Sequence, residues 1–309
     1  DLGYAEDGLV VDLLAKNPED ITDPGTYHFC DPARAGSRVF VGYSRKRWEL
    51  RLNPGDDRKD ITKPKNIWKL LERWTGPDQA SLERAAIYTF RSAIAEKWQS
   101  GRLFIAGDAA HLTPPFMGQG MCAGIRDSVN LGWKLARVVN KSAPPAILDS
   151  YESERKPHVR AFIEMTVKMG RLINRTASTL LSGAPVDEDN GPPTITRITP
   201  TLGDGLSAGS PELRGHLFPQ PRLENSGLLD DLIGNRPALI ISPGFMADLP
   251  AEVRKQADAR NVAIVHETSD ELATWFAKAK IGAVMLRPDR YILGSAYTRE
   301  QLDDLIAAA

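Results

Sequence analysis

The residues with the clearest chemical pattern lie where a short apolar segment gives way to a loop. Residues 103–106 predict a buried strand that ends at Gly107 and Asp108, and a loop rich in Pro and Gly then leads to a helix near Gly120. A carboxylate at the carboxyl end of a strand lies where α/β folds bind ligands, and Asp108 suits the hydroxyl groups of a polyol because it only accepts hydrogen bonds. The free N–H groups of a helix N-terminus suit an anionic or electron-rich group.

A Gly-Asp pair after a strand is common, and alone it indicates only a turn. The whole succession is more specific, and it resembles the second FAD-binding motif of the class A flavoprotein aromatic hydroxylases, such as phenol hydroxylase and 3-(3-hydroxyphenyl)propionate hydroxylase. Residues 151–157 resemble the start of the helix that follows in that family, and residues 284–291 resemble the end of its thioredoxin-like third domain. The motif itself consists of Gly107, Asp108, Ala109, Ala110, His111, Pro114, Pro115, Gly118, Gln119, Gly120, Met121 and Asp127.

The resemblance implies a cofactor site for FAD, with NAD(P)H as co-substrate. Asp108 is then expected to bind the ribityl hydroxyl groups, and the backbone of Pro114 and Pro115 to lie over the flavin and the substrate. The amides of Gly120 and Met121 would face the pyrimidine edge of the ring. The expected cofactor-binding residues are Gly107, Asp108, Pro115, Gly118, Gln119, Gly120, Met121 and Cys122.

The same resemblance implies the reaction of a FAD-dependent monooxygenase. Such an enzyme hydroxylates a phenolic compound with NAD(P)H and O₂ through a flavin C4a-hydroperoxide, as in the catabolism of aromatic compounds. The cofactor carries the organic chemistry, while the protein supplies position and electric field. We assign no catalytic side chain and no metal ligand from the sequence.

Two features depart from the family pattern. Cys122 stands where the family usually has Asn, although a buried, inert cysteine is the commoner role of such a residue. No strand–GxGxxG–helix fingerprint occurs, since Gly118, Gly120 and Gly124 have the wrong spacing. Two interpretations stay open: the flavin and substrate part of a hydroxylase, or an inactive C-terminal fragment that only folds or oligomerises. On either interpretation the isolated chain is expected to retain little FAD.

The substrate is expected to lie against the β-rich region formed by residues 1–100. Alternation over residues 47–52 predicts a strand with apolar and charged faces. Trp48, Tyr88 and Phe90 are candidates for the wall of the substrate site, although ordinary sheet core is the commoner role for each. The arginines at positions 45, 47 and 51 could pair with a substrate carboxylate, or line a solvated strand face.

The remaining elements define the expected fold and domains. We expect an α/β (α+β) fold, in which a partial FAD and substrate domain of the hydroxybenzoate-hydroxylase type precedes a thioredoxin-like domain. Residues 101–182 would hold the Gly-Asp segment and a long helix, residues 183–236 a linker, and residues 237–309 the βαβαββα order of the thioredoxin-like domain. An apolar stripe through Ile125, Val129 and Val139 predicts that the helix after Gly120 is amphipathic.

Composition excludes several classes of protein. The chain has 309 residues and a formal net charge of −1, with no block of like charge, so a nucleic-acid-binding arm is not expected. It also has no run of apolar residues long enough to span a membrane. Only two cysteines, Cys30 and Cys122, occur, which excludes a disulfide scaffold and a thiol redox role for the C-terminal domain. We expect a cytoplasmic protein with a small phenolic substrate and keep a homodimer open.

Overall fold

The computed structural model describes all residues except 18, 20–24, 182–198, 226, 246–248 and 267–268. The chain forms two compact units. The first unit comprises residues 1–95, 111–120 and 163–196, and the second comprises residues 96–110, 121–162 and 197–309. Two long helices contribute residues to both units, α2 (Gly120–Val139) and α3 (Ser150–Leu181). The domain bounds predicted from the sequence stay a prediction.

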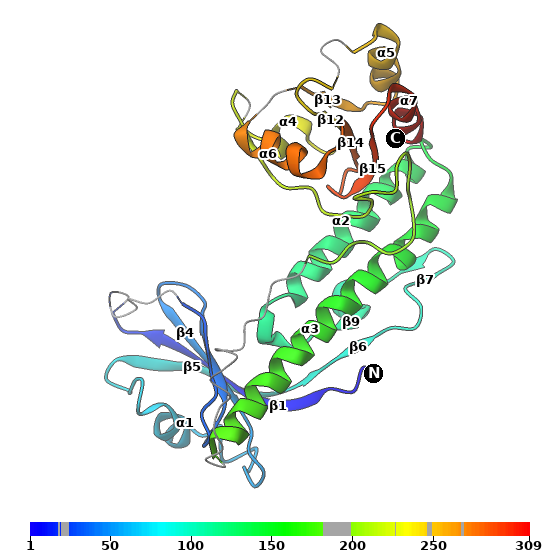
Figure 1. Ribbon diagram of the computed structural model, residues 1–309. Helices are drawn as coiled ribbons and strands as arrows, with labels where there is room; N and C mark the ends of the chain where they lie inside the picture. The colour runs from blue at the N-terminus through cyan, green and yellow to red at the C-terminus, as the bar shows by residue number, and fades with distance from the viewer. Residues whose placement is uncertain (18, 20–24, 182–198, 226, 246–248, 267–268) are drawn as a thin grey trace. The chain divides into compact units, whose positions relative to one another are not determined.

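The first unit is built on an antiparallel five-stranded sheet whose strand order is β2-β3-β4-β1-β5 (Figure 1). Because side chains alternate along each strand, one face collects the apolar residues, such as Leu9 of β1 and Trp48 of β4. Helix α1 covers this face with Ile67 and Leu71, which are fully buried. The bounds are β1 Ala5–Ala15, β2 Tyr27–Phe29, β3 Gly36–Phe40, β4 Arg45–Arg51, α1 Pro64–Leu71 and β5 Ala80–Arg91.

Short elements connect the sheet to the long helices. In the first unit, β6 pairs with β9, and the 3₁₀ turn η3 precedes α2. In the second unit, β7 pairs with β8, and the 3₁₀ turn η2 contains the Gly-Asp pair. The bounds are β6 Ala93–Ile94, β7 Gln99–Ser100, β8 Leu103–Phe104, η2 Gly107–Ala109, β9 His111–Leu112, η3 Pro115–Met117 and η4 Pro145–Asp149.

Helix α2 buries its polar side rather than its apolar stripe. Its apolar stripe is open within the described part of the chain, since Ile125 is 54% and Val139 76% exposed. The buried side of α2 instead carries polar side chains such as Asp127 and Lys134. These pair with charged residues of other elements in the same unit, which offsets the cost of removing them from water.

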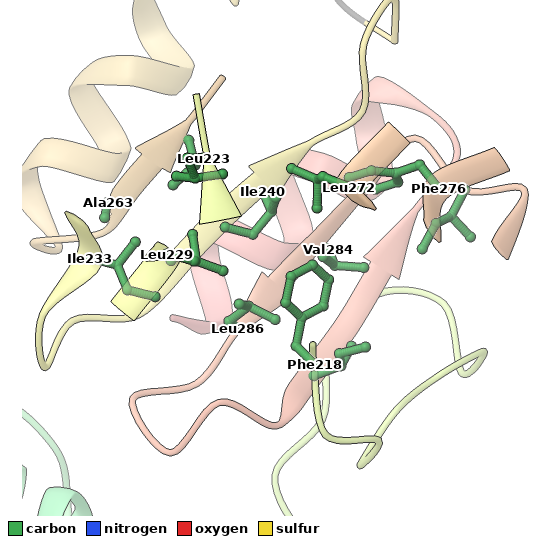
Figure 2. Packing of buried hydrophobic residues seen from close by; sticks show 14 residues of the cluster. Phe218, Leu223, Leu229, Ile233, Ile240, Ala263, Leu272, Phe276, Val284 and Leu286 are labelled. Atoms are coloured by element: carbon green, nitrogen blue, oxygen red, sulfur yellow. The ribbon is translucent and has the colours of Figure 1, made fainter. Parts of the chain in front are cut away.

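The C-terminal part of the second unit has the βαβαββα order that the sequence predicts. Its sheet has the strand order β13-β12-β14-β15, in which only β12 and β13 are parallel. Figure 2 shows the core on one face, where Leu272 and Phe276 of α6 pack on the sheet. Helices α5 and α7 cover the other face. The bounds are β12 Ala238–Ile241, α5 Ala251–Ala259, β13 Ala263–Val265, α6 Asp270–Ala279, β14 Ala283–Leu286, β15 Ile292–Ala296 and α7 Arg299–Ala308.

The described part of the predicted linker also packs on this sheet. It forms β10 (Arg222–Leu223), β11 (Gly227–Leu228) and α4 (Leu229–Ile233). Figure 2 shows Phe218, Leu223 and Leu229 in the same core as the strands. The mixed α/β fold class predicted from the sequence is therefore confirmed. Among the described residues, no helix is both long and apolar enough to cross a membrane.

Candidate functional site

The Gly-Asp turn follows β8 in the second unit, as the sequence predicts. The chain is extended at Ala106 and turns at Gly107, whose φ of 58° lies in the left-handed region that favours glycine. The N–H of Ala110 donates to the carbonyl oxygen of Gly107 at 2.8 Å and closes the turn. The N–H of Gly107 donates to Oδ2 of Asp127 on α2 at 3.1 Å. The turn is thus attached to the helix that follows it.

Two glycines bring the turn and α2 into close contact. A Cβ atom added at Gly124 would lie 3.2 Å from the Cα atom of Gly107, which is tighter than most contacts of this kind. The helix and the turn therefore approach backbone to backbone. Asp108, the next residue of the turn, is exposed.

A buried ion pair with Arg155 fixes Asp127, the residue that holds the turn. Nε of Arg155 on α3 donates to Oδ1 of Asp127 at 2.8 Å, and both side chains are completely buried. Arg155 belongs to the segment 151–157 that carries part of the resemblance, yet the sequence alone assigned it no role. Its positioning role through Asp127 depends on contacts between residues far apart in the chain, which only the structure shows.

Asp108 has the properties expected of a ligand-binding carboxylate. Its side chain is exposed and forms no hydrogen bond or ion pair with the part of the chain that the structure describes. In the same unit, Met121 is 77% exposed and Cys122 half-buried in the first turn of α2. An exposed acceptor without a partner among the described residues fits the ribityl chain of a flavin, whose hydroxyl groups are donors. The residues present therefore fit FAD.

The loop before α2 belongs to the first unit and contains one orphaned polar atom. Pro114 is buried, the 3₁₀ turn η3 follows, and Gly118 has a left-handed φ of 61°. Nε2 of Gln119 donates to the carbonyl oxygen of Met117 at 3.3 Å. Oε1 of Gln119 is buried without a hydrogen-bond partner among the described residues. A buried amide oxygen of this kind is expected to accept a hydrogen bond from a group outside these residues.

The second face of the five-stranded sheet, opposite α1, lines a cavity in the first unit. The cavity is small, with a volume of about 20 Å³, and we call it the sheet pocket. Its lining includes two aromatic side chains, Phe90 and Phe116, and four polar ones that bear on ligand binding, namely Glu6, Glu49, Arg51 and Asn174.

The three aromatic residues proposed for the substrate wall lie in different places. Phe90 lines the sheet pocket, where its ring occupies the space above Gly8; a Cβ atom on Gly8 would lie 2.4 Å from that ring. Tyr88 is 42% exposed and accepts a hydrogen bond from Arg84. Trp48 is buried on the opposite sheet face, under α1. Only Phe90 of the three therefore lines this pocket.

The three arginines of β4 also differ. Arg45 pairs with Glu83. Arg47 pairs with Asp12, and Asp12 forms a second ion pair with Arg84. Arg51 donates instead to two amide oxygens, at 3.3 Å from Asn174 and 3.5 Å from Asn53, and no carboxylate among the described residues pairs with it. Of these three side chains, Arg51 alone lines the sheet pocket.

A buried charge cluster of the second unit joins α2 and α3 to the C-terminal part of the chain. Glu154 accepts hydrogen bonds from Lys134 at 2.7 Å and from Arg287 at 2.7 and 2.8 Å, and Arg287 also pairs with Asp289. Burial by itself would raise the pKa of Glu154, but Arg287 and Lys134 outweigh it and lower the pKa to about 2. Burial lowers the pKa of Lys134 to about 8. Every charge in this cluster has a partner, which indicates a structural role.

Within the described residues, no group of His, Cys, Asp and Glu side chains is arranged to hold a metal ion. Cys30 and Cys122 are both free thiols. Burial raises the pKa of the Cys30 thiol, and a thiol of this kind is less reactive than an ordinary one.

Comparison with protein families gives two matches that together cover most of the chain. Residues 12–166, just over half of the chain, match the family model described as FAD binding domain. Residues 244–309 match the model described as HcaD C-terminal domain. The second match begins just after β12 of the C-terminal sheet.

Two curated proteins are about equally similar to the chain. One is a probable NADH-specific resorcinol 4-hydroxylase of Rhodococcus jostii (strain RHA1), 32% identical over 99% of this chain and 60% of its own length. The other is a 3-(3-hydroxy-phenyl)propionate/3-hydroxycinnamic acid hydroxylase of Klebsiella pneumoniae, 32% identical over 93% of this chain and 59% of its own length. The chain therefore spans about three fifths of the length of these relatives.

Two solved structures with the same fold contain a bound flavin. The chain superimposes on aklavinone-11 hydroxylase, solved with FAD and aklavinone, with a TM-score of 0.71 at 22% identity over 99% of this chain and 62% of that one. It superimposes on the rebeccamycin biosynthetic enzyme RebC, solved with reduced flavin, with a TM-score of 0.69 at 20% identity over 100% of this chain and 64% of that one. At these identities the likeness concerns the fold alone.

Proposed function

The chain belongs to the family of class A FAD-dependent aromatic hydroxylases, and from this premise we propose that it forms the flavin- and substrate-binding part of an enzyme that hydroxylates a phenolic compound. The FAD binding domain match and the two hydroxylases at 32% identity support the proposal. Because the chain spans three fifths of those relatives, the activity of the whole protein is part of the proposal.

The proposed cofactor site uses the chain's own acceptors and backbone groups. Asp108 accepts hydrogen bonds from the ribityl hydroxyl groups, and Asp127 keeps the turn at Gly107 in the position that presents it. The other predicted contacts, from Pro115, Gly118, Gln119, Gly120, Met121 and Cys122, stay a prediction. FAD, when bound, supplies the chemistry that uses electrons from NAD(P)H and one atom of O₂ to hydroxylate the aromatic ring.

The proposed substrate site lies on the sheet face that lines the sheet pocket. Phe90 and Phe116 offer aromatic surface to a phenolic ring, and aromatic rings favour offset or edge-to-face contacts with one another. The backbone of Pro114 and Pro115 is proposed to lie near both the flavin and the substrate, as the family resemblance implies. No side chain of the chain is assigned a proton-transfer step.

The observation that carries the proposal is the exposed, unpaired Asp108 on a turn held by Asp127. To test the function, the native protein is incubated with FAD, NADH or NADPH, ¹⁸O₂ and either resorcinol or 3-(3-hydroxyphenyl)propionate, and the product is analysed by mass spectrometry. We expect a hydroxylated product with one ¹⁸O atom. Oxidation of the nicotinamide without a labelled product, from either resorcinol or 3-(3-hydroxyphenyl)propionate, would contradict the proposal.

A second candidate function is a folded module that has no activity by itself. The absence of a GxGxxG fingerprint from the sequence favours it for the isolated chain, because no adenine-side motif would hold the rest of FAD. The two candidates differ in flavin content. The flavin absorbance of the purified chain is compared with that of the native protein. If the native protein is yellow and active but the chain holds less than stoichiometric flavin, the module role applies to the chain alone.

A further inference from the structure

We infer that the C-terminal segment 287–291 positions the turn that presents Asp108, and that the hydroxyl group of Tyr291 acts on this turn through Arg155 and Asp127. The inference rests on the proposed function, because it concerns the FAD site at Asp108. The segment connects β14 to β15 in the second unit. Three observations carry the inference: the burial of the segment's polar side chains, the places where they dock, and the hydrogen-bonded groups that lead from them to the turn.

The segment buries side chains that a connection between strands usually exposes. Such connections run over the surface, where water solvates their polar groups. Here Arg287, Asp289 and Tyr291 are all buried, whereas Arg290 pairs with Asp230 of α4. Burial of three polar side chains in one short turn costs free energy unless each finds a partner. The partners therefore indicate what the segment does.

The partners of the segment lie on the two long helices. Arg287 donates to both carboxylate oxygens of Glu154 on α3, at 2.7 and 2.8 Å. Oδ2 of Asp289 accepts hydrogen bonds from Nδ2 of Asn130 at 2.9 Å and from Nε1 of Trp133 at 3.1 Å, both on α2. The segment thus holds α2 and α3 at the same time.

The docking positions are next to the ion pair that holds the turn. Asn130 follows Asp127 by three residues on α2, and Glu154 directly precedes Arg155 on α3. Residues three apart on a helix are neighbours on its surface. The segment therefore fixes both helices within one helical turn of the ion pair, whose carboxylate accepts the hydrogen bond from the N–H of Gly107.

Tyr291 reaches the ion pair itself. Its hydroxyl group lies 3.0 Å from Nε2 of His158 on α3, and the two rings meet edge to face with centroids 5.9 Å apart. Burial raises the pKa of Tyr291, while Arg155 opposes that rise through its charge and through a hydrogen bond with the tyrosine side chain. The completely buried guanidinium of Arg155 thus has two side-chain partners, Asp127 and Tyr291.

The neutral state of His158 keeps a second positive charge away from Arg155. Burial, together with the charges of Arg155 and Arg126, lowers the pKa of His158 to about 3. The hydroxyl group of Tyr291 can then accept a hydrogen bond from Arg155 and donate one to Nε2 of His158. Tyr291→Phe would keep the ring but provide neither hydrogen bond, which makes Tyr291 a positioning residue that can be tested by removing one oxygen atom.

The first test is hydrogen–deuterium exchange of the chain, resolved to the N–H of Gly107 by mass spectrometry. In wild type we expect this N–H to be protected by its hydrogen bond to Asp127. In Tyr291→Phe we expect exchange there to be roughly 3- to 10-fold faster, the effect of losing about one hydrogen bond. Tyr297→Phe is the matched control, since Tyr297 is exposed at the end of β15 and interacts with Glu212 rather than with the helices. It should exchange as wild type does.

The second test is a flavin fluorescence titration of the native protein with FAD. We expect Tyr291→Phe to raise the dissociation constant roughly 3- to 10-fold, and to raise it no further when added to Asp108→Ala, because the turn then has no carboxylate to present. A tyrosine with a merely structural role would weaken FAD binding equally with and without Asp108. Circular dichroism establishes that the variants fold.

Three results would overturn the inference: an unprotected N–H at Gly107 in wild type, a wild-type exchange rate at Gly107 in Tyr291→Phe, or an equal loss of FAD affinity in both backgrounds. The exchange measurement needs no flavin. Its failure is therefore distinct from failure of the native protein to bind FAD, which would contradict the proposed function.

Discussion

The N–H of Gly107 donates a hydrogen bond to Oδ2 of Asp127 at 3.1 Å, so the turn that presents Asp108 is attached to a buried side chain of α2. Oδ1 of the same carboxylate is taken up by Arg155 of α3. One buried carboxylate thus connects three elements of the second unit. The motif that resembles a cofactor site is held in place by a residue that does not itself reach the surface.

Asp127→Ala should therefore destabilise the fold. Removing one partner of a buried ion pair leaves Arg155 charged and unpaired in the interior, which costs about 3–5 kcal/mol. The free energy of unfolding, from urea denaturation followed by circular dichroism, measures the effect. Asp108→Ala removes a neighbouring but exposed carboxylate and serves as the control, with a change below about 0.5 kcal/mol. Equal stability of wild type and Asp127→Ala would contradict a structural role for the pair.

Gly107→Ala tests the conformation of the turn. The φ of 58° disfavours any residue with a Cβ atom, so we expect a loss of about 1–2 kcal/mol in the free energy of unfolding. The added Cβ atom would lie 3.6 Å from Gly124, an ordinary contact, so the cost is conformational rather than steric.

Gly132→Ala is the matched control for this prediction. Gly132 lies within α2, and the space that a Cβ atom would occupy there is open, so alanine should stabilise the helix by about 0.5–1 kcal/mol. The two substitutions are chemically identical but should change the urea midpoint in opposite directions. A shift in the same direction for both would show that Gly107 does not need its left-handed conformation.

The buried cluster around Glu154 should make the stability depend on pH in acid. The pKa of Glu154 is lowered to about 2 in the folded chain, below its usual value of 4.5. The stabilisation is therefore fully present above pH 4.5 and is lost as the pH falls toward 2, with a total of a few kcal/mol. Unfolding by urea between pH 6 and pH 3 measures the slope.

A variant separates Glu154 from the other acidic groups of the chain. In Glu154→Gln the slope of stability against pH in this window should be smaller than in wild type, although the variant is less stable at pH 7 because Lys134 and Arg287 lose their shared partner. Exposed Glu72→Gln should keep the wild-type slope. A slope equal to that of wild type in Glu154→Gln would assign the acid sensitivity to other carboxylates.

The sequence predicted the parts of the molecule that depend on local pattern. The strand, turn and helix around Asp108 and the βαβαββα order of the C-terminal sheet follow from hydrophobic periodicity and from the positions of Gly and Pro, which act over a few residues. The turn, helix α2 and the C-terminal elements are present where the sequence places them. The buried strand predicted over residues 103–106 is wrong in extent and burial, because β8 spans only Leu103–Phe104 and Leu103 is 76% exposed.

The pattern failed where long-range contacts decide which face of an element is buried. The stripe through Ile125 and Val129 is apolar, yet the structure buries the opposite side of α2, where Asp127 and Lys134 meet partners from α3. Trp48 was proposed for the substrate wall, but the pairing of β4 with β1 turns it toward α1. Register and ion-pair partners that lie twenty or more residues apart are not encoded in local periodicity.

The position of Glu49 in the sheet pocket could not be predicted for a similar reason. In the sequence it is one charged residue among several on β4, and it is distinguished only by what surrounds it in space. Arg45 and Arg47 on the same strand pair with carboxylates, whereas Glu49 lines the sheet pocket. The pocket brings together residues 6, 49, 90, 116 and 174.

The most direct test of the account is the affinity of the native protein for FAD with and without the carboxylate of Asp108. Flavin fluorescence during titration gives the dissociation constants of wild type, Asp108→Ala and the control Asp78→Ala, which removes another exposed, unpaired carboxylate. Loss of a hydrogen bond to a charged acceptor should raise the dissociation constant of Asp108→Ala roughly 10- to 150-fold and leave that of Asp78→Ala unchanged. Equal dissociation constants for wild type and Asp108→Ala would show that the Gly-Asp pair is only a turn.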